Sequence, residues 1–331
     1  METKHNLERK RREKLTQHIY GNTPCFLNSN IVDIHDQKQL EKTDILVYGV
    51  PWEGAVTWGD YTGCELGPKV IRLNSARYSG YLPELDHIDV LEHYTIGDVG
   101  DVSIVPTHAK ETMHRIEEFA TNVWKSGKFP IAFGGDHTIT YPIVKALGKH
   151  IQGKVGIIHL DAHYDNHKQY EGERYARNTS FHRLYENEHV RNESIVHMGI
   201  HGPRNEPITG KYAQEVGATT ITIRDIRQAG NLKDIAKAAY EIAEKEVDVV
   251  YLSICSDVLD FAYNPGGPVD GNGLTSFELL ELIYEFAKLG IHGLDYVEVY
   301  PQQDANDHSS HFVTYAILYA LAGKAVYDQK V

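Results

Sequence analysis

The chain has 331 residues, of which 41% are hydrophobic, and a formal net charge of −13. This acidity argues against nucleic acid and anionic membranes as main partners, and no hydrophobic run approaches the roughly 18 residues that a membrane-spanning helix needs. Only three cysteines occur, Cys25, Cys64 and Cys255. So sparse a set argues against a disulfide framework and predicts a reducing, cytoplasmic location.

The first 40 residues are expected to form an N-terminal arm, and residues 41–331 a single domain. Basic and acidic side chains are mixed between Lys4 and Lys14. This segment lacks the hydrophobic stretch of a secretory signal, and its acidic residues argue against a transit peptide. A solvated arm or helix is therefore expected.

Hydrophobic, β-branched runs alternate with amphipathic stretches through the remainder of the chain. Strands are predicted at residues 45–50, 94–98, 130–133, 155–160, 195–200, 219–223, 247–254 and 293–299. Helices are predicted at residues 67–78, 108–125, 138–147, 179–185, 207–215, 232–244, 276–289 and 311–322. Such alternation predicts an α/β fold in which helices cover both faces of a parallel sheet.

The segment Asp161-Ala162-His163-Tyr164-Asp165 directly follows the predicted strand at residues 155–160. In an extended chain, residues at positions i, i+2 and i+4 point the same way. The two carboxylates and the imidazole are therefore expected to converge. Buried carboxylates this close would repel one another unless a cation or protons neutralised them, so the segment predicts a metal site.

Three further strand ends carry chemically active side chains. Gly134-Gly135-Asp136-His137 follows the third strand, Ser253 to Asp257 closes the seventh, and Val297-Glu298-Val299 ends the eighth. Ligands of α/β proteins bind at the carboxyl ends of the strands. The sequence therefore predicts one site at this edge of the sheet.

These segments, in this order and spacing, resemble the ureohydrolase family, which includes arginase, agmatinase, guanidinobutyrase and formimidoylglutamase. The likeness begins near residue 45 and includes Gly49-Val50-Pro51-Trp52-Glu53-Gly54 and Gly97-Asp98-Val99-Gly100-Asp101. The resemblance implies a three-layer α/β/α domain around an eight-stranded, mostly parallel sheet. It also implies a homo-oligomer, a trimer or hexamer, and two divalent metal ions, Mn(II) above all.

The resemblance further implies roles for individual residues. The expected metal ligands are His137, Asp161, His163, Asp165, Asp257 and, at an altered position, Cys255. Asp257, His163 and Glu298 are the expected catalytic residues, with Asp257 relaying a proton and Glu298 binding the guanidinium of a small-molecule substrate. Two adjacent cations lower the pKa of a shared water, and the resulting hydroxide would attack the guanidinium carbon and release urea.

Cys255 is the largest departure from the family pattern, because an aspartate that bridges both metals usually stands there. A thiolate is softer than a carboxylate and would favour Zn(II), Ni(II) or Fe(II) over Mn(II). Alternatively, one metal position is weakened or lost, or the buried cysteine serves only packing. The sequence leaves these alternatives open.

Arg177 is the second departure, since guanidino-specific members usually carry a proton-shuttling histidine at this place. Arginine cannot shuttle protons at neutral pH because its pKa exceeds about 12, but it can bind a substrate carboxylate. Arg177, Asn178 and His167 are therefore the predicted substrate-binding residues besides Glu298. His167 or His182 is a candidate for the missing proton shuttle.

Three functions follow. The first is a metal-dependent hydrolase that releases urea from a guanidino compound, which the retained Glu298 and metal positions favour. The second is a formimino or other amidine hydrolase, like formimidoylglutamase, which Arg177 favours. The third is a catalytically weak homologue that acts as a binding subunit, which Arg177 and Cys255 together favour.

Overall fold

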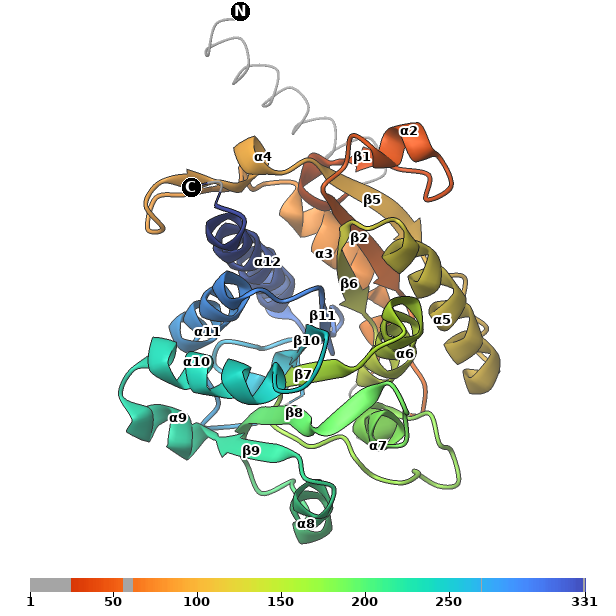
Figure 1. Cartoon of the computed structure of the whole chain (residues 1–331), viewed down its shortest axis with the longest axis vertical. Helices are drawn as coiled ribbons and strands as arrows, with labels where there is room; N and C mark the ends of the chain where they lie inside the picture. Colours follow the sequence, from red (N-terminus) through yellow and green to blue (C-terminus); the bar gives the residue numbers. More distant parts are fainter. Residues whose placement is uncertain (1–24, 56–61, 269, 330) are drawn as a thin grey trace, which may run out of the picture.

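A single sheet of nine strands forms the centre of the structure, a computed structural model that describes residues 25–55, 62–268, 270–329 and 331 (Figure 1). Its order is β1-β5-β2-β6-β11-β10-β7-β8-β9, and every pairing between these strands is parallel. The strands are β1 (Asn30–Ile31), β2 (Ile45–Val50), β5 (Ile96–Asp101), β6 (Phe129–Gly134), β7 (Val155–Leu160), β8 (Val190–Ile200), β9 (Thr219–Thr222), β10 (Val249–Cys255) and β11 (Leu294–Val297).

All eight predicted strands are present, and the sheet gains one that was not predicted. The additional strand is β1, which pairs with β5 at the edge of the sheet. Its two residues are too short to give a hydrophobic pattern. Phe26 and Leu27, just before β1, are buried in the core. Residues 25–31 of the predicted N-terminal arm thus pack on the domain, and the charged segment from Lys4 to Lys14 lies outside the described residues.

The helices are α2 (Gln37–Leu40), α3 (Gly67–Ser75), α4 (Val90–His93), α5 (Ala109–Lys125), α6 (Thr140–Ile151), α7 (Ser180–Tyr185), α8 (Pro207–Glu215), α9 (Ile223–Ala229), α10 (Leu232–Ala243), α11 (Ser276–Leu289) and α12 (His308–Tyr327). Between α3 and α4 lies a small antiparallel pair of strands, β3 (Tyr81–Leu82) and β4 (Ile88–Asp89). The eight predicted helices are confirmed with small shifts at their ends. Helix α9 was missed because Thr222, read as strand, also caps this short helix through a capping box with Asp225.

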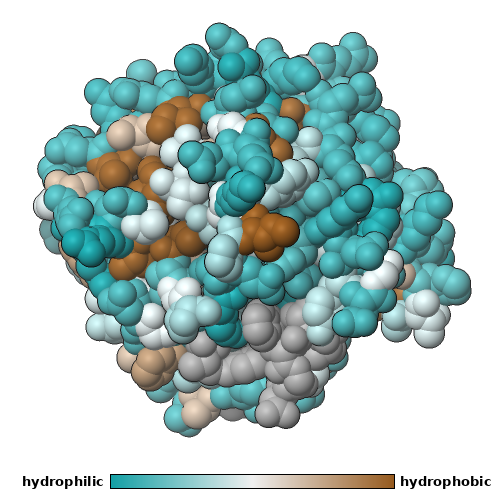
Figure 2. Space-filling view, turned by 90° about the horizontal axis from the view of Figure 1, so that it is seen from below, coloured by the Kyte–Doolittle hydropathy of each residue, from teal (hydrophilic) through white to brown (hydrophobic). Residues whose placement is uncertain are grey.

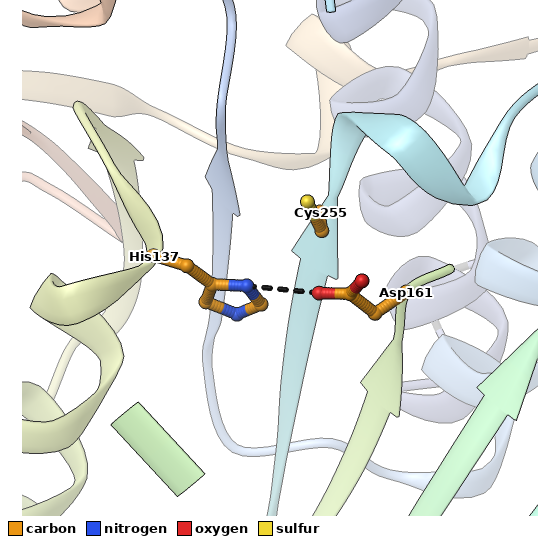
Figure 3. Close-up of side chains that lie close together, drawn as sticks. All are labelled: His137, Asp161 and Cys255. Carbon is orange, nitrogen blue, oxygen red and sulfur yellow. Dashed lines mark ion pairs between the residues drawn. The ribbon is translucent and has the colours of Figure 1, made fainter. Parts of the chain in front are cut away.

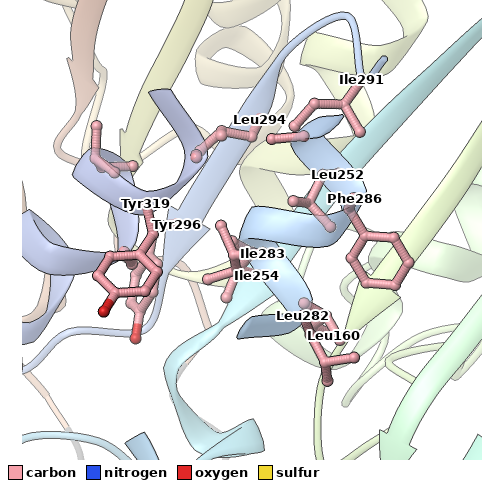
Figure 4. Packing of buried hydrophobic residues seen from close by; sticks show 14 of the residues in the cluster. Leu160, Leu252, Ile254, Leu282, Ile283, Phe286, Ile291, Leu294, Tyr296 and Tyr319 are labelled. Atoms are coloured by element: carbon pink, nitrogen blue, oxygen red, sulfur yellow. The ribbon is translucent and has the colours of Figure 1, made fainter. Parts of the chain in front are cut away.

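Helices cover both faces of the sheet, which confirms the three-layer architecture. Neighbouring residues of a strand point to opposite faces: Ile157 packs in the layer of α5, α6 and α7, and Ile158 packs in the layer of α10, α11 and α12. Figure 4 shows the second layer, where side chains of β10 and β11 contact those of α11. Burial on both faces explains why the central strands read as continuous hydrophobic runs.

The surface is largely hydrophilic in the view of Figure 2, with hydrophobic residues gathered in one area. Helix α12 is the longest helix of the described residues, and most of its side chains are buried, with α11 and α3 as its main neighbours. No helix within the described residues combines the length and hydrophobicity that crossing a membrane requires.

Candidate active site

Four strand ends deliver the predicted side chains to one edge of the sheet. His137 begins a short 3-10 helix after β6, and Asp161 directly follows β7. Cys255 is the last residue of β10, with Asp257 two residues later, and Glu298 directly follows β11. Because these strands are neighbours and parallel, their carboxyl ends lie together, as the sequence predicted.

His137, Asp161 and Cys255 form one group of potential metal ligands (Figure 3). One ligand atom of each lies within 4.8 Å of those of the other two, and all three residues are buried. The Nδ1 atom of His137 is 2.9 Å from Asp161 Oδ2 and 3.0 Å from Asp165 Oδ2. Asp165 therefore joins this group through His137.

Asp161, His163 and Asp257 form a second group on the same scale. His163 Nδ1 lies 3.0 Å from Asp257 Oδ2 and 3.6 Å from Asp161 Oδ1. Asp161 belongs to both groups, with Oδ2 facing the first and Oδ1 facing the second. The six predicted ligands thus surround two adjacent positions that share one carboxylate.

The hydrogen bonds of His137 show which of its nitrogens faces the carboxylates as an acceptor. Ser253 Oγ donates to Asp295 at 2.7 Å, so it accepts from Nε2–H of His137 at 3.0 Å. Nδ1 of the neutral ring then carries the lone pair. It makes no well-formed hydrogen bond with any residue of the described chain, although it faces Asp161 and Asp165. A proton or a cation is needed between these three groups.

The pKa values of these groups show how strongly the site attracts positive charge. Burial disfavours the charged ring of His137, but the carboxylates of Asp161 and Asp165 beside it raise its pKa well above its usual value. Burial, followed by the charge of Asp161, raises the pKa of Asp165 to about 6. Each group has one imidazole and buried carboxylate oxygens, which fit hard divalent cations such as Mn(II), and the first group adds the Cys255 sulfur, which favours softer ions such as Zn(II). The residues therefore fit a pair of metal ions.

The segment after β7 converges in a different way from the one predicted. It is not extended, because Ala162 and His163 lie in a bend. Asp165 has φ 46°, in the left-handed region that a residue with a Cβ adopts only at a cost. Glu298 has φ 63° as well. Such strain is typical of functional sites, where the surrounding structure holds a side chain in a required direction.

A buried chain of neutral rings lies behind Asp161. His159 Nε2 is 2.8 Å from Asp161 Oδ2, His159 Nδ1 is 2.8 Å from His197 Nδ1, and His197 Nε2 is 2.6 Å from the hydroxyl of Tyr185. Burial lowers the pKa of His159 to about 4 and that of His197 well below its usual value. With both rings neutral, each hydrogen bond has one direction: Tyr185 donates to His197, His197 to His159, and His159 to Asp161.

Arg177 is buried and paired with carboxylates of the protein itself. Its Nη2 is 2.9 Å from Glu53 Oε1, and its Nη1 is 3.4 Å from Glu298 Oε2. Nη1 also donates to the hydroxyl of Tyr300, which donates to Glu298 in turn. Burial raises the pKa of Glu298 to about 7, although Arg177 acts to lower it. The two carboxylates hold the guanidinium charged in the interior.

A cavity of about 310 Å³ opens beside the second group. His163, Asp165, His167 and Asn178 contribute to its lining. The Oδ1 atom of Asn178 is buried and makes no hydrogen bond with the described residues. This volume is at the lower end of the range for small-molecule sites. His182, the other candidate shuttle, is not among the residues that line this cavity; its Nδ1 is bound to Asn166 O at 3.1 Å.

Comparison with known proteins identifies the architecture. Residues 43–323 match the Arginase family. The chain belongs to the arginase family. This member is 32% identical to an agmatinase of Bacillus anthracis over 85% of the chain and 92% of that protein. It is 33% identical to a formimidoylglutamase of Halalkalibacterium halodurans over 90% of the chain and 96% of that protein.

Among solved structures, the fold matches a formiminoglutamase variant of Trypanosoma cruzi, solved with Mn2+, with a TM-score of 0.80. The match covers 92% of this chain and 99% of that one at 23% identity, which shows a common fold. The arginase-family fold predicted from the sequence is thus confirmed.

Three site residues of this arginase-family chain were not predicted. Asp270 lies 3.3 Å from His163 Nε2 and also binds Arg204. His159 contacts Asp161, and Glu53 contacts Arg177. His159 precedes Asp161 by two residues on a buried strand, which was a usable signal. Asp270 and Glu53 lie in loops that are distant in sequence from their partners, and no local sequence pattern predicts their contacts.

Proposed function

We propose that this arginase-family chain is a metal-dependent hydrolase that cleaves a C–N bond of a small guanidino compound and releases urea. The observation that carries the proposal is the cavity beside two adjacent ligand groups that share Asp161. The agmatinase relative supports this substrate class by its name. The arginase-family assignment and the hard oxygen donors support two divalent ions, Mn(II) first, with Ni(II) or Zn(II) as alternatives because of Cys255.

The proposed ligands are His137, Asp161, Asp165 and Cys255 for one ion, and Asp161, His163 and Asp257 for the other. When bound, the ions would supply a hydroxide nucleophile at neutral pH. The chain itself positions the substrate in the cavity, which Asn178 helps to line. His163 and His167 line the same cavity. Asp257 Oδ2, held 3.0 Å from His163 Nδ1, is the proposed relay for the proton that the departing amine needs.

A second candidate function is the hydrolysis of a formimino or other amidine group. The ion pair between Arg177 and Glu298 favours it, because Glu298 is already engaged by a guanidinium of the protein. The formimidoylglutamase relative supports the same candidate by its name. Such a substrate would release formamide or ammonia in place of urea.

A homo-oligomer, trimeric or hexameric, and a cytoplasmic location complete the proposal. The location is supported by the cysteines, since Cys25, Cys64 and Cys255 are all buried free thiols. Gel filtration with light scattering measures the oligomeric state, and a monomer would contradict that part.

The experiment is an assay of urea, formamide and ammonia release after loading the protein with Mn(II), Ni(II) or Zn(II). Agmatine, arginine, guanidinobutyrate, guanidinopropionate and formiminoglutamate form the substrate panel. An Asp161→Asn variant, which removes the charge shared by both groups, is the inactive control. Urea from one compound is the expected result. Formamide or ammonia without urea would support the second function, and no product with metal bound would overturn both.

A further inference from the structure

The surroundings of Arg177 are those of a bound guanidinium. Its side chain is only 3% exposed, and it lies between two carboxylates, Glu53 and Glu298. A planar guanidinium with carboxylates at separate nitrogens is the arrangement by which proteins recognise a guanidino ligand. Here the guanidinium belongs to the chain itself.

Glu298 has both of its oxygens engaged in this arrangement. Oε1 accepts the backbone N–H of His137 at 2.8 Å. Oε2 accepts from the hydroxyl of Tyr300 and is paired with Arg177 Nη1. Glu298 is 3% exposed and does not contribute to the lining of the cavity of about 310 Å³, which reaches the neighbouring Asn178. Arg177 does not line this cavity either, and its guanidinium lies against Glu298 Oε2 where a ligand of that carboxylate would have to lie.

The hold on Arg177 is incomplete. Its Nε is buried and makes no hydrogen bond with the described residues, and the contact of Nη1 with Glu298 is long at 3.4 Å. The hydrogen bond from Arg177 Nη2 to Glu53 Oε1 has an ordinary length, 2.9 Å. A buried donor without a partner destabilises the arrangement that contains it. Displacement of this side chain by a better-fitting guanidinium is therefore physically accessible.

We propose that Arg177 is a specificity-determining residue whose own guanidinium occupies the Glu298 subsite, so that a guanidino substrate binds only in competition with it. The inference rests on the proposed function, since it assigns Glu298 to the guanidinium of the substrate. A substrate N–H group reaches Glu298 when Arg177 leaves. Removal of Arg177 therefore frees the subsite, whereas a clamp for a substrate carboxylate would lose affinity on the same change.

The test compares the Arg177→Ala variant with the native protein under the metal that supports most activity. KM for agmatine, which bears no carboxylate, is expected to fall roughly tenfold to a hundredfold, the range for one charge-assisted hydrogen bond. The kcat value should stay within about threefold, because the competition precedes chemistry. Free guanidinium should become a competitive inhibitor of the variant only. An unchanged or higher KM overturns the inference, and a rise confined to carboxylate-bearing substrates identifies a carboxylate clamp.

A binding measurement keeps the test independent of turnover. Millimolar guanidinium chloride and agmatine should each raise the Tm of Arg177→Ala by more than they raise that of the native protein, in which the ligand must displace Arg177. Arg72→Ala is the matched control, because Arg72 of α3 is also buried and paired with two carboxylates, Asp98 and Asp101 of β5. Guanidinium fits that void also, whereas a protection by agmatine greater than in the native protein is expected for Arg177→Ala alone. If these Tm shifts are observed but none of the proteins releases product, the proposed function is wrong and the occupation of the subsite by Arg177 is supported. Equal Tm shifts in all three proteins would show that Arg177 does not occupy a guanidinium subsite.

Glu53→Gln is the second variant, for the case that Arg177→Ala does not fold. It keeps the size and shape of residue 53 and removes one of the two charges that hold Arg177. KM for agmatine should fall by a smaller factor, about threefold to tenfold. A KM equal to that of the native protein would overturn the competition.

Discussion

His159 links the proposed metal ligand Asp161 to the buried chain that ends at Tyr185. Its ring is stacked on Phe181, with 3.8 Å between the ring centroids. A His159→Phe substitution keeps an aromatic ring of similar size in this stack and removes both ring nitrogens. The variant therefore tests the polar contribution of His159 with little change in packing.

The expected magnitude follows from two lost contacts. The hydrogen bond of His159 Nε2 to Asp161, 2.8 Å long, is one to an ionised group and contributes about 1.5–3 kcal/mol. Loss of the 2.8 Å contact with His197 leaves a buried nitrogen unpaired, at about 1–3 kcal/mol. We expect the free energy of unfolding without metal to fall by about 3 kcal/mol or more. Metal affinity should fall about tenfold to a hundredfold, as it does when the partner of a ligand is removed.

Urea unfolding of the metal-free protein and calorimetric titration with Mn(II) measure the two effects. Tyr185→Phe is the matched control, because it removes only the far hydroxyl, 2.6 Å from His197 Nε2, and leaves the contact with Asp161 in place. Tyr185→Phe should lower the free energy of unfolding by about 1 kcal/mol and keep the metal affinity within about threefold of the native value. Metal affinity of His159→Phe within that same range would refute the role assigned to His159.

Three further predictions concern the metal, the pH dependence and the packing. Cys255→Asp places a hard oxygen beside Asp161, so the affinity for Mn(II) relative to Zn(II) should rise about tenfold; an unchanged ratio in a metal competition titration would show that residue 255 is no ligand. Burial acts to raise the pKa of Glu117, but its ion pairs with Lys145 and Lys149 outweigh burial and lower that pKa. The ion pairs therefore stabilise the folded protein at neutral pH, and this contribution is lost as pH falls through the lowered pKa. Urea unfolding of Glu117→Gln should therefore show a deficit of about 0.5–1 kcal/mol at pH 7 that shrinks below about pH 4, since the pair is partly exposed and screened; a deficit independent of pH contradicts this. A Cβ on Gly135 would lie 1.8 Å from the backbone oxygen of Trp52, so Gly135→Ala should lower the free energy of unfolding by about 3 kcal/mol or more; an unchanged Tm contradicts it.

The strand ends were predictable because chemistry and hydrophobic pattern coincide there. Each central strand is hydrophobic on both faces, so its limits are visible, and His137, Asp161 and Glu298 stand immediately beyond them. The metal groups followed from this placement and from the family resemblance. Parallel order then brings together residues that are far apart in sequence.

The partners of Arg177 were not predictable, since Glu53 is 124 residues away and lies in a loop. The short strand β1 and the bend after β7 were missed for a related reason. Two residues carry no periodic pattern, and the left-handed backbone of Asp165 is set by its surroundings. The local sequence pattern indicates which side chains of a strand or helix are buried. The direction of a loop side chain depends on the whole fold and leaves no such pattern.

The position of β11 has a consequence for how the protein is made. It is the last strand along the chain, yet it lies in the middle of the sheet, paired with β6 on one side and β10 on the other (Figure 1). Until it leaves the ribosome, the sheet consists of two separate halves, β1-β5-β2-β6 and β10-β7-β8-β9. His137 belongs to the first half and Asp161 to the second, so a nascent chain cannot close the first ligand group. Pairing over such long sequence separations is slow, and a chain that ends before residue 294 would expose two open sheet edges to aggregation.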